Sequence, residues 1–225
     1  MRFLTPALTA LAVCVAVPST AGELGWGGGA LVGSPRGELG RQIGTGGGVY
    51  GHALYGAREG ALAIRFDGSF FLYGSETLRV PFSSSRGLDR IDREVRTDNR
   101  IGDLVAGPQL TVPSGRVRPY VNAFAGVAYY STTSELVEPF PIGPTLSSTN
   151  FDDAVFSYGG GAGILVPIGK GRTAVDAGVR WVHGGRARYL TKGDLRDDGR
   201  GGVSFTPRES EGDRLEFRLG VTIAP

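Results

Sequence analysis

The chain has 225 residues, with 24 basic and 22 acidic side chains, a formal net charge of +2, 38 glycines and one cysteine. This near-balanced charge, without a basic stripe interleaved with aromatics, argues against nucleic-acid binding. Abundant glycine and the lack of helix-period apolar segments after Ala21 argue against a helix-rich fold.

The first 21 residues have the pattern of a secretory signal. Arg2 supplies a positive start, residues 3–17 are mostly apolar, and Ser19, Thr20 and Ala21 offer small side chains for cleavage. An uncleaved anchor helix would need about 20 apolar residues, and this segment has fewer. We therefore predict a signal peptide over 1–21, cleavage near Ala21, and a mature domain over 22–225.

The only cysteine, Cys14, lies inside this predicted signal. A mature chain without thiols suits an oxidising compartment, and it excludes disulfides and cysteine metal sites. No run of 18 apolar residues follows, so a membrane role would require a β-barrel.

Strand-like segments then follow one another, and their connections alternate between tight and long. The tight links lie at 57–60, 113–116 and 167–172, and the long polar stretches at 75–99, 135–154 and 191–213. Tight turns at one end and long loops at the other are typical of an outer-membrane barrel, with the turns in the periplasm. We count eight strands, the first two glycine-rich and lying near 26–33 and 46–55.

Period-two alternation predicts which side chains face lipid. In the third segment Leu62, Ile64, Phe66, Phe70 and Leu72 share one face, while Ala63, Arg65, Asp67, Ser69, Phe71 and Tyr73 share the other. The fourth, seventh and eighth segments follow the same rule, the fifth, over 120–130, follows it more weakly, and the sixth, over 156–166, is glycine-rich. Eight charges consequently point inward: Arg65, Asp67, Asp103, Asp176, Arg180, Arg214, Glu216 and Arg218. Because buried charges are tolerated mainly in pairs, we predict a lumen plugged by salt bridges, in which Asp176 neutralises a cation.

Aromatic residues near the strand ends predict two girdles. We assign Phe70, Phe71, Tyr73, Tyr129, Tyr130, Phe156 and Trp181 to the external ring, and Tyr55 and Tyr120 to the periplasmic ring. The strand glycines are expected where a narrow lumen leaves little room for side chains.

Two strands resemble those of a known group. The segment 118–129, RPYVNAFAGVAY, resembles the RPY-x-x-x-x-x-G-x-x-Y strand of small outer-membrane barrels of the OmpA, OmpX and OmpW kind, and 176–181, DAGVRW, is similar to their D-x-G-x-R-[YW] strand. The resemblance implies an all-β, antiparallel, eight-stranded up-and-down barrel in the outer membrane, with membrane lipid and the barrel assembly machinery as partners. The chain ends in Ile223, Ala224 and Pro225, whereas such barrels usually end in an aromatic residue.

Motifs for chemistry are nearly absent. Gly46, Gly48 and Gly51 match G-x-G-x-x-G, but a strand pattern runs through them where a dinucleotide site needs a following helix. His52 and His183 lie in no metal-ligand spacing, and neither fits the H-x-S-N pattern of lipid A deacylating barrels. Acids in the long stretches, Asp152, Asp153, Asp194, Asp197 and Asp198, lack EF-hand spacing. We predict no enzyme activity and no catalytic, cofactor or metal site.

The sequence favours an outer-membrane barrel with a structural or surface-interaction role, whose external loops meet an unknown extracellular partner. One alternative is a small porin-like channel or a conduit for apolar compounds. Another is a soluble periplasmic barrel that binds a small ligand.

Overall fold

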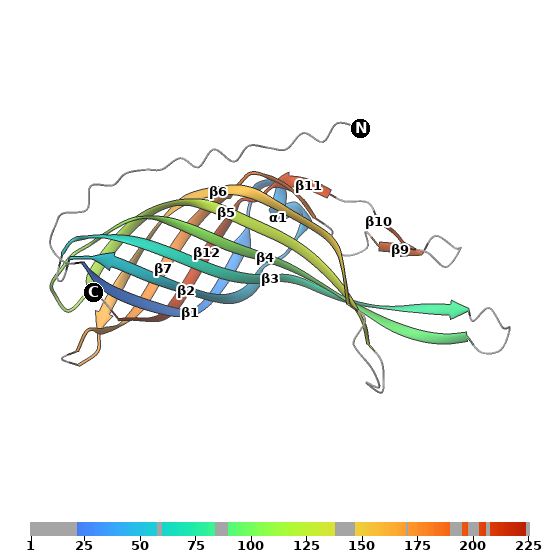
Figure 1. Ribbon diagram of the computed structural model, residues 1–225, viewed down its shortest axis with the longest axis horizontal. Helices are drawn as coiled ribbons and strands as arrows, with labels where there is room; N and C mark the ends of the chain where they lie inside the picture. The colour runs from blue at the N-terminus through green and yellow to red at the C-terminus, as the bar shows by residue number, and fades with distance from the viewer. Residues whose placement is uncertain are drawn as a thin grey trace.

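A computed structural model describes residues 22–57, 60–83, 90–137, 147–169, 171–189, 195–197, 203–205 and 208–223. Eight antiparallel strands close into a barrel in the order β1-β12-β7-β6-β5-β4-β3-β2 (Figure 1). They are β1 (Glu23–Pro35), β2 (Gly46–Gly56), β3 (Leu62–Ser83), β4 (Arg90–Thr111), β5 (Arg118–Val137), β6 (Ser147–Pro167), β7 (Thr173–Gly184) and β12 (Arg214–Ile223). The predicted fold class is confirmed, while the predicted signal peptide lies outside the described residues.

The alternation along the strands is confirmed by side-chain exposure. In β3, Phe66 and Phe70 are exposed on the outer wall, whereas Arg65, Asp67 and Phe71 are buried inside. In β12, Phe217, Leu219 and Val221 are exposed, and the intervening side chains are buried or half-buried. The barrel is therefore apolar outside and largely polar or charged inside, the reverse of a soluble barrel.

Strand pairing continues beyond the ends that the sequence suggested. After a bulge between Leu72 and Gly74, β3 and β4 stay paired as far as Ser83 and Arg90, and Figure 1 shows both running past the barrel together. Likewise β5 and β6 include parts of 135–154. Placing these stretches wholly in loops was therefore wrong, because a backbone ladder between polar strands needs no apolar alternation.

Two of the connections at this end carry structure of their own. Between β1 and β2 lies the short helix α1 (Gly37–Gln42). Between β7 and β12, β8 (Arg186–Tyr189) pairs with β11 (Arg208–Glu211), and β9 (Leu195–Asp197) pairs with β10 (Val203–Phe205). Among the described residues, no helix is both long and apolar enough to cross a membrane.

The girdle assignment needs correction for four aromatic residues. Phe71, Tyr73, Tyr120 and Tyr130 are buried inside the barrel. The other five do lie on the outer wall, namely Tyr55, Phe70, Tyr129, Phe156 and Trp181. The assignment used height along the strand and ignored the face, yet adjacent residues of a strand point to opposite sides of the sheet.

Glycine is required where these inward rings lie over neighbouring strands of the wall. A Cβ atom at Gly33 would lie 2.6 Å from the ring of Phe71, and one at Gly163 would lie 2.5 Å from the ring of Tyr120. Both distances are far below van der Waals contact, so the narrow lumen explains the glycine content of the neighbouring strands.

Candidate functional site

The interior is organised around a group of buried charges, which we call the lumen charge network: Arg65, Asp67, Asp103, Arg180, Arg214, Glu216 and Arg218. Asp67 lies at its centre. Its carboxylate accepts a hydrogen bond from Arg65 Nε at 2.8 Å and another from Arg218 Nη1 at 2.9 Å. Arg180 Nη1 lies 3.4 Å from the same carboxylate. Three guanidinium groups from β3, β7 and β12 thus converge on one buried carboxylate.

The second half of the network follows from spacing along β12. Arg214, Glu216 and Arg218 are two residues apart, so all three point inward. Arg214 Nε and Arg218 Nη2 each lie 2.8 Å from Glu216. Arg214 also pairs with Asp103 of β4, which accepts a hydrogen bond from Ser69 Oγ at 2.9 Å. Charge-assisted contacts of this kind tie non-adjacent walls of the barrel together.

Aromatic rings cover three of the guanidinium groups. The guanidinium carbon of Arg180 lies 3.8 Å from the ring centre of Phe124, and that of Arg218 lies 4.6 Å from the ring centre of Tyr50. Arg65 lies 5.8 Å from the ring of Tyr120 and donates a 2.8 Å hydrogen bond to Gln109. Ring faces attract cations, so these contacts add to the ion pairs.

Asp176 is buried as predicted, but its partners differ from the prediction. It accepts hydrogen bonds from the hydroxyl groups of Tyr120 at 2.8 Å and Thr222 at 3.1 Å. Among the described residues it forms no salt bridge. The expectation that Asp176 neutralises a cation is therefore wrong, because the stagger of the strands places hydroxyl groups beside it.

The Asp176 carboxylate also determines which ring nitrogen of His52 carries a hydrogen. The Thr222 hydroxyl has one hydrogen, which it gives to Asp176, and its oxygen lies 3.2 Å from Nε2 of His52. His52 Nε2 must then be the donor in that contact. The imidazole is buried and packs against Tyr50, with ring centres 6.0 Å apart. Its described contacts are those of a lumen residue, not of a metal ligand.

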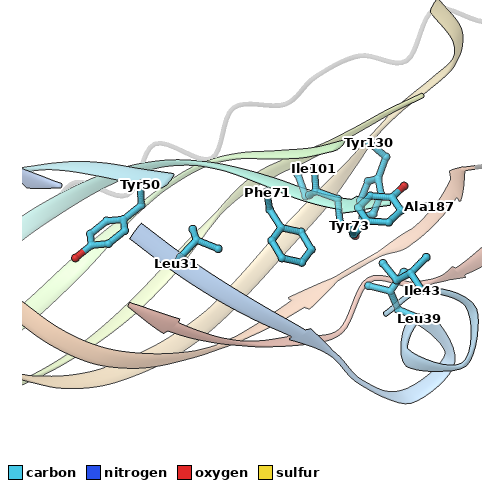
Figure 2. Close-up of a cluster of buried hydrophobic side chains, with 10 residues drawn as sticks. Leu31, Leu39, Ile43, Tyr50, Phe71, Tyr73, Ile101, Tyr130 and Ala187 are labelled. Carbon is cyan, nitrogen blue, oxygen red and sulfur yellow. The ribbon is translucent and has the colours of Figure 1, made fainter. Parts of the chain in front are cut away.

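A cluster of buried apolar side chains lies inside the barrel towards the end with the long connections, and we call it the plug. Leu39 of α1 and Ile43 just after it are buried against aromatic and aliphatic side chains of the wall (Figure 2). The other members are Leu31, Tyr50, Phe71, Tyr73, Ile101, Ala128, Tyr130 and Ala187. The segment that contains α1 therefore contributes Leu39 and Ile43 to this cluster, which removes their side chains from water.

Polar contacts hold the plug in place. The backbone N–H of Arg36 donates to the Asp213 carbonyl at 2.8 Å, and Arg208 donates to Gln42 at 2.8 Å. The Asp213 carboxylate lies 2.5 Å from His183 Nδ1 at the end of β7. His183 is partly exposed, with its ring centre 4.9 Å from that of Tyr158. Neither Asp213 nor Tyr158 is a serine, threonine or cysteine that the imidazole could activate.

The remaining candidate positions show no common site. Gly46, Gly48 and Gly51 lie within β2, and no helix follows them as a dinucleotide site would require. Asp152 accepts a hydrogen bond from Tyr129, and Asp153 accepts one from the backbone of Arg188. Asp194 and Asp198 lie outside the described residues, as does the side chain of Asp197. Within the described part, no cluster of three or more His, Cys, Asp or Glu side chains is placed to hold a metal ion.

Sequence reasoning did not find α1 or the His183–Asp213 pair. The spacing of Leu39 and Ile43 by four residues in a polar segment was the available signal for a buried helical face. Asp213 lies 30 residues after His183, beyond the β8 to β11 segment, so no local pattern links the two residues.

Comparisons with known proteins return structures alone. No protein-family model and no curated protein matches the chain. Similar solved structures include Neisserial surface protein A, with 14% identity over 91% of this chain and 99% of that one and a TM-score of 0.48. Ail, the attachment invasion locus protein of Yersinia pestis, is 13% identical over 90% of this chain and 98% of that one, with a TM-score of 0.46. The outer membrane protease OmpT from Escherichia coli is 9% identical over 80% of this chain and 64% of that one, with a TM-score of 0.45. The assignment of the fold rests on the strand pairing.

Proposed function

We propose that this protein is an outer-membrane β-barrel with a structural or surface-interaction role. In this role the barrel is a closed scaffold, and the connections at the α1 end face outside the cell. The observation that carries the proposal is the outer wall, where large apolar side chains are exposed on every barrel strand. Examples are Leu104, 75% exposed, Phe156, 63% exposed, and Trp26, 60% exposed.

An outer wall of this composition would be unstable in water. Large apolar side chains cost free energy when exposed to solvent, and contiguous patches of them mark interaction surfaces or lipid contact. The wall supports membrane insertion over the alternative of a soluble periplasmic barrel. The tight turns at the other end of the barrel are then periplasmic, as in other barrels of this kind.

The interior supports a closed lumen over a channel. Paired charges lie in its middle, and the plug lies towards one end. A conduit for apolar compounds would have to displace both, at a cost in broken ion pairs. A catalytic role gains no support either. The Thr222 hydroxyl beside His52 donates its hydrogen to Asp176 rather than to the imidazole, and His183 contacts a carboxylate, so neither histidine activates a hydroxyl nucleophile.

Under this proposal the partners are outer-membrane lipid, the barrel assembly machinery during insertion, and an extracellular molecule that meets the extended connections. The paired extensions of β3 and β4 continue past the barrel as far as Ser83 and Arg90 (Figure 1), which suits recognition at a surface. Shortening β3 and β4 to a tight turn after Leu72 should leave folding intact and abolish any adhesion phenotype.

The test is fractionation with gel mobility. The mature protein should sediment with outer membranes, and its mobility should change on boiling, because a closed barrel has no free strand edge from which to unfold. Recovery of the folded chain in the soluble periplasmic fraction would contradict the proposal.

A further inference from the structure

We propose that β8 and β11 form a strap across the α1 end of the barrel, and that the His183–Asp213 pair latches this strap in a pH-dependent way. A proton on His183 tightens the latch, and its loss at higher pH lets the strap open locally. The inference goes beyond the proposed function, which only places this end of the barrel outside the cell.

The strap lies between opposite walls of the barrel. In the closed order of the strands, β5 and β6 lie across from β1 and β2. β8 packs against β5 and β6, whereas β11 packs against α1, which follows β1. Figure 1 shows β11 and α1 together at this end. The strap and α1 therefore reach from one wall to the other.

The inner face of the strap is buried. Ala187 of β8 and Ser210 of β11 pair across the ladder, and their side chains are 0% and 1% exposed. Ala187 also belongs to the plug, and Figure 2 shows it among the other plug side chains. Opening of the strap would expose both residues to water, so their accessibility reports on the open state.

Glycine marks the junction between the strap and the barrel. β7 ends at Gly184, Gly185 separates it from β8, and Gly212 follows β11. The backbone N–H of Gly212 donates to the Gly184 carbonyl at 2.9 Å, and a Cβ atom at Gly212 would overlap the Tyr130 hydroxyl oxygen. The closed strap thus lies directly on the wall. Backbone without side chains joins it to the barrel, so it can turn there at little steric cost.

The latch is the cross-strand pair directly next to this junction. Arg214 pairs with Val182, so the next residues along the ladder, Asp213 and His183, lie opposite each other. The Asp213 carboxylate lies 2.5 Å from His183 Nδ1, but the oxygen concerned makes no aligned hydrogen bond. The attraction therefore depends mainly on charge. The Asp213 carbonyl also accepts the hydrogen bond from Arg36, so the latch connects the strap, the wall and the segment of α1.

Histidine is the residue type here whose charge ordinarily changes between about pH 5 and 8. The His183 ring faces Tyr158 of β6 and the Asp213 carboxylate. The charged side chains on the elements packed around the pair, within the described residues, are Asp153 of β6, Arg36 and Glu38 at α1, and Arg186, Arg188, Arg208, Glu209 and Glu211 of the strap. Arginine, tyrosine and carboxylic acid side chains ordinarily keep their charge over this range. Lowering the pH from 8 to 5.5 therefore adds one positive charge beside Asp213.

Labelling of a buried thiol measures how often the strap opens. Cys14, the only cysteine of the sequence, is replaced with serine, and Ser210→Cys then places a thiol of nearly the same size under the strap. The refolded barrel, verified by its gel shift on boiling, is treated with a methanethiosulfonate reagent at pH 8 and at pH 5.5. Each rate is divided by the rate for the same thiol in a His183→Asn background, because this ratio cancels the pH dependence of the thiol.

We expect similar rates in the two backgrounds at pH 8. At pH 5.5 the barrel with His183 should react about two- to fivefold more slowly than the His183→Asn barrel, which is the range of a partly exposed ion pair. Asp213→Asn should abolish this difference. Ala174→Cys is the matched control, because Ala174 is buried at the other end of β7 and reports opening of the barrel as a whole. Its rate should not depend on His183.

Equal rates in the two backgrounds at pH 5.5, or a difference that survives Asp213→Asn, would overturn the inference. The same His183-dependent slowing at Ala174→Cys would also overturn it, because His183 would then stabilise the whole barrel and not the strap. Ala187→Cys, opposite Ser210 in the ladder, serves as the reporter if the Ser210→Cys chain does not refold.

Discussion

Replacing Asp67 with asparagine should strongly destabilise the barrel. The substitution keeps the size of the side chain and removes its charge. Arg65 would retain its hydrogen bond to Gln109, and Arg218 would retain Glu216. Arg180 would lose the one carboxylate with which it is recorded to pair, and its Nε already has no hydrogen-bond partner.

The magnitude follows from the uncompensated cation. Removing one partner of a buried ion pair typically costs about 3–5 kcal/mol, because the remaining charge stays buried. We expect a loss of about that size in the free energy of unfolding. Adding Arg180→Met should recover most of it, since methionine can keep contact with the Phe124 ring without a charge.

The assay is urea unfolding of the refolded barrel in detergent micelles, followed by tryptophan fluorescence and by gel mobility. Asp152→Asn is the matched control, because this carboxylate is exposed and bonded to Tyr129 outside the lumen, and it should change stability by about 0.5 kcal/mol or less. A loss below about 1 kcal/mol for Asp67→Asn, or no recovery in the double variant, would refute the reasoning.

Further substitutions probe other parts of the barrel. Asp176→Ala should cost about 2 kcal/mol in urea unfolding, less than Asp67→Asn, because it leaves neutral hydroxyl groups rather than a cation without a partner. Gly33→Ala should cost about 1–3 kcal/mol, and Phe71→Leu should restore stability in the double variant if the clash is with that ring. In lipid, Leu104→Arg on the outer wall should lower the free energy of unfolding by about 2–4 kcal/mol, whereas Val117→Arg in a turn should lower it by about 1 kcal/mol or less. Equal losses for the two variants would argue against a membrane-embedded wall.

The sequence was sufficient for the barrel and for the inward charges, and the reason is the period of two. Around Arg65 in β3 and along β12, a charged or small residue alternates with an apolar one, so the face of Arg65 or Glu216 follows from counting. The sequence did not predict which of the inward charges pair with each other. Asp176 meets Tyr120 and Thr222 because of how strands distant in sequence are staggered, and side-chain alternation within one strand does not encode that stagger.

The plug and the strand ends were missed for different reasons. Helix α1 has six residues, too few for a periodic apolar pattern to stand out. In the extensions of β3 and β4, the pairing is between backbones of polar strands, so the sequence there resembles a loop. Local patterns therefore predicted the elements whose stability comes from side-chain burial and failed where backbone hydrogen bonds or long-range contacts decide.

The central claim is a membrane-spanning barrel with a closed lumen. Single-channel recording in planar bilayers tests it most directly, using protein whose insertion is first verified by the gel shift on boiling. We predict no steady conductance, because the lumen charge network and the plug lie in the interior and would have to be displaced by a passing ion. A large and steady single-channel current from the inserted wild-type barrel would contradict it.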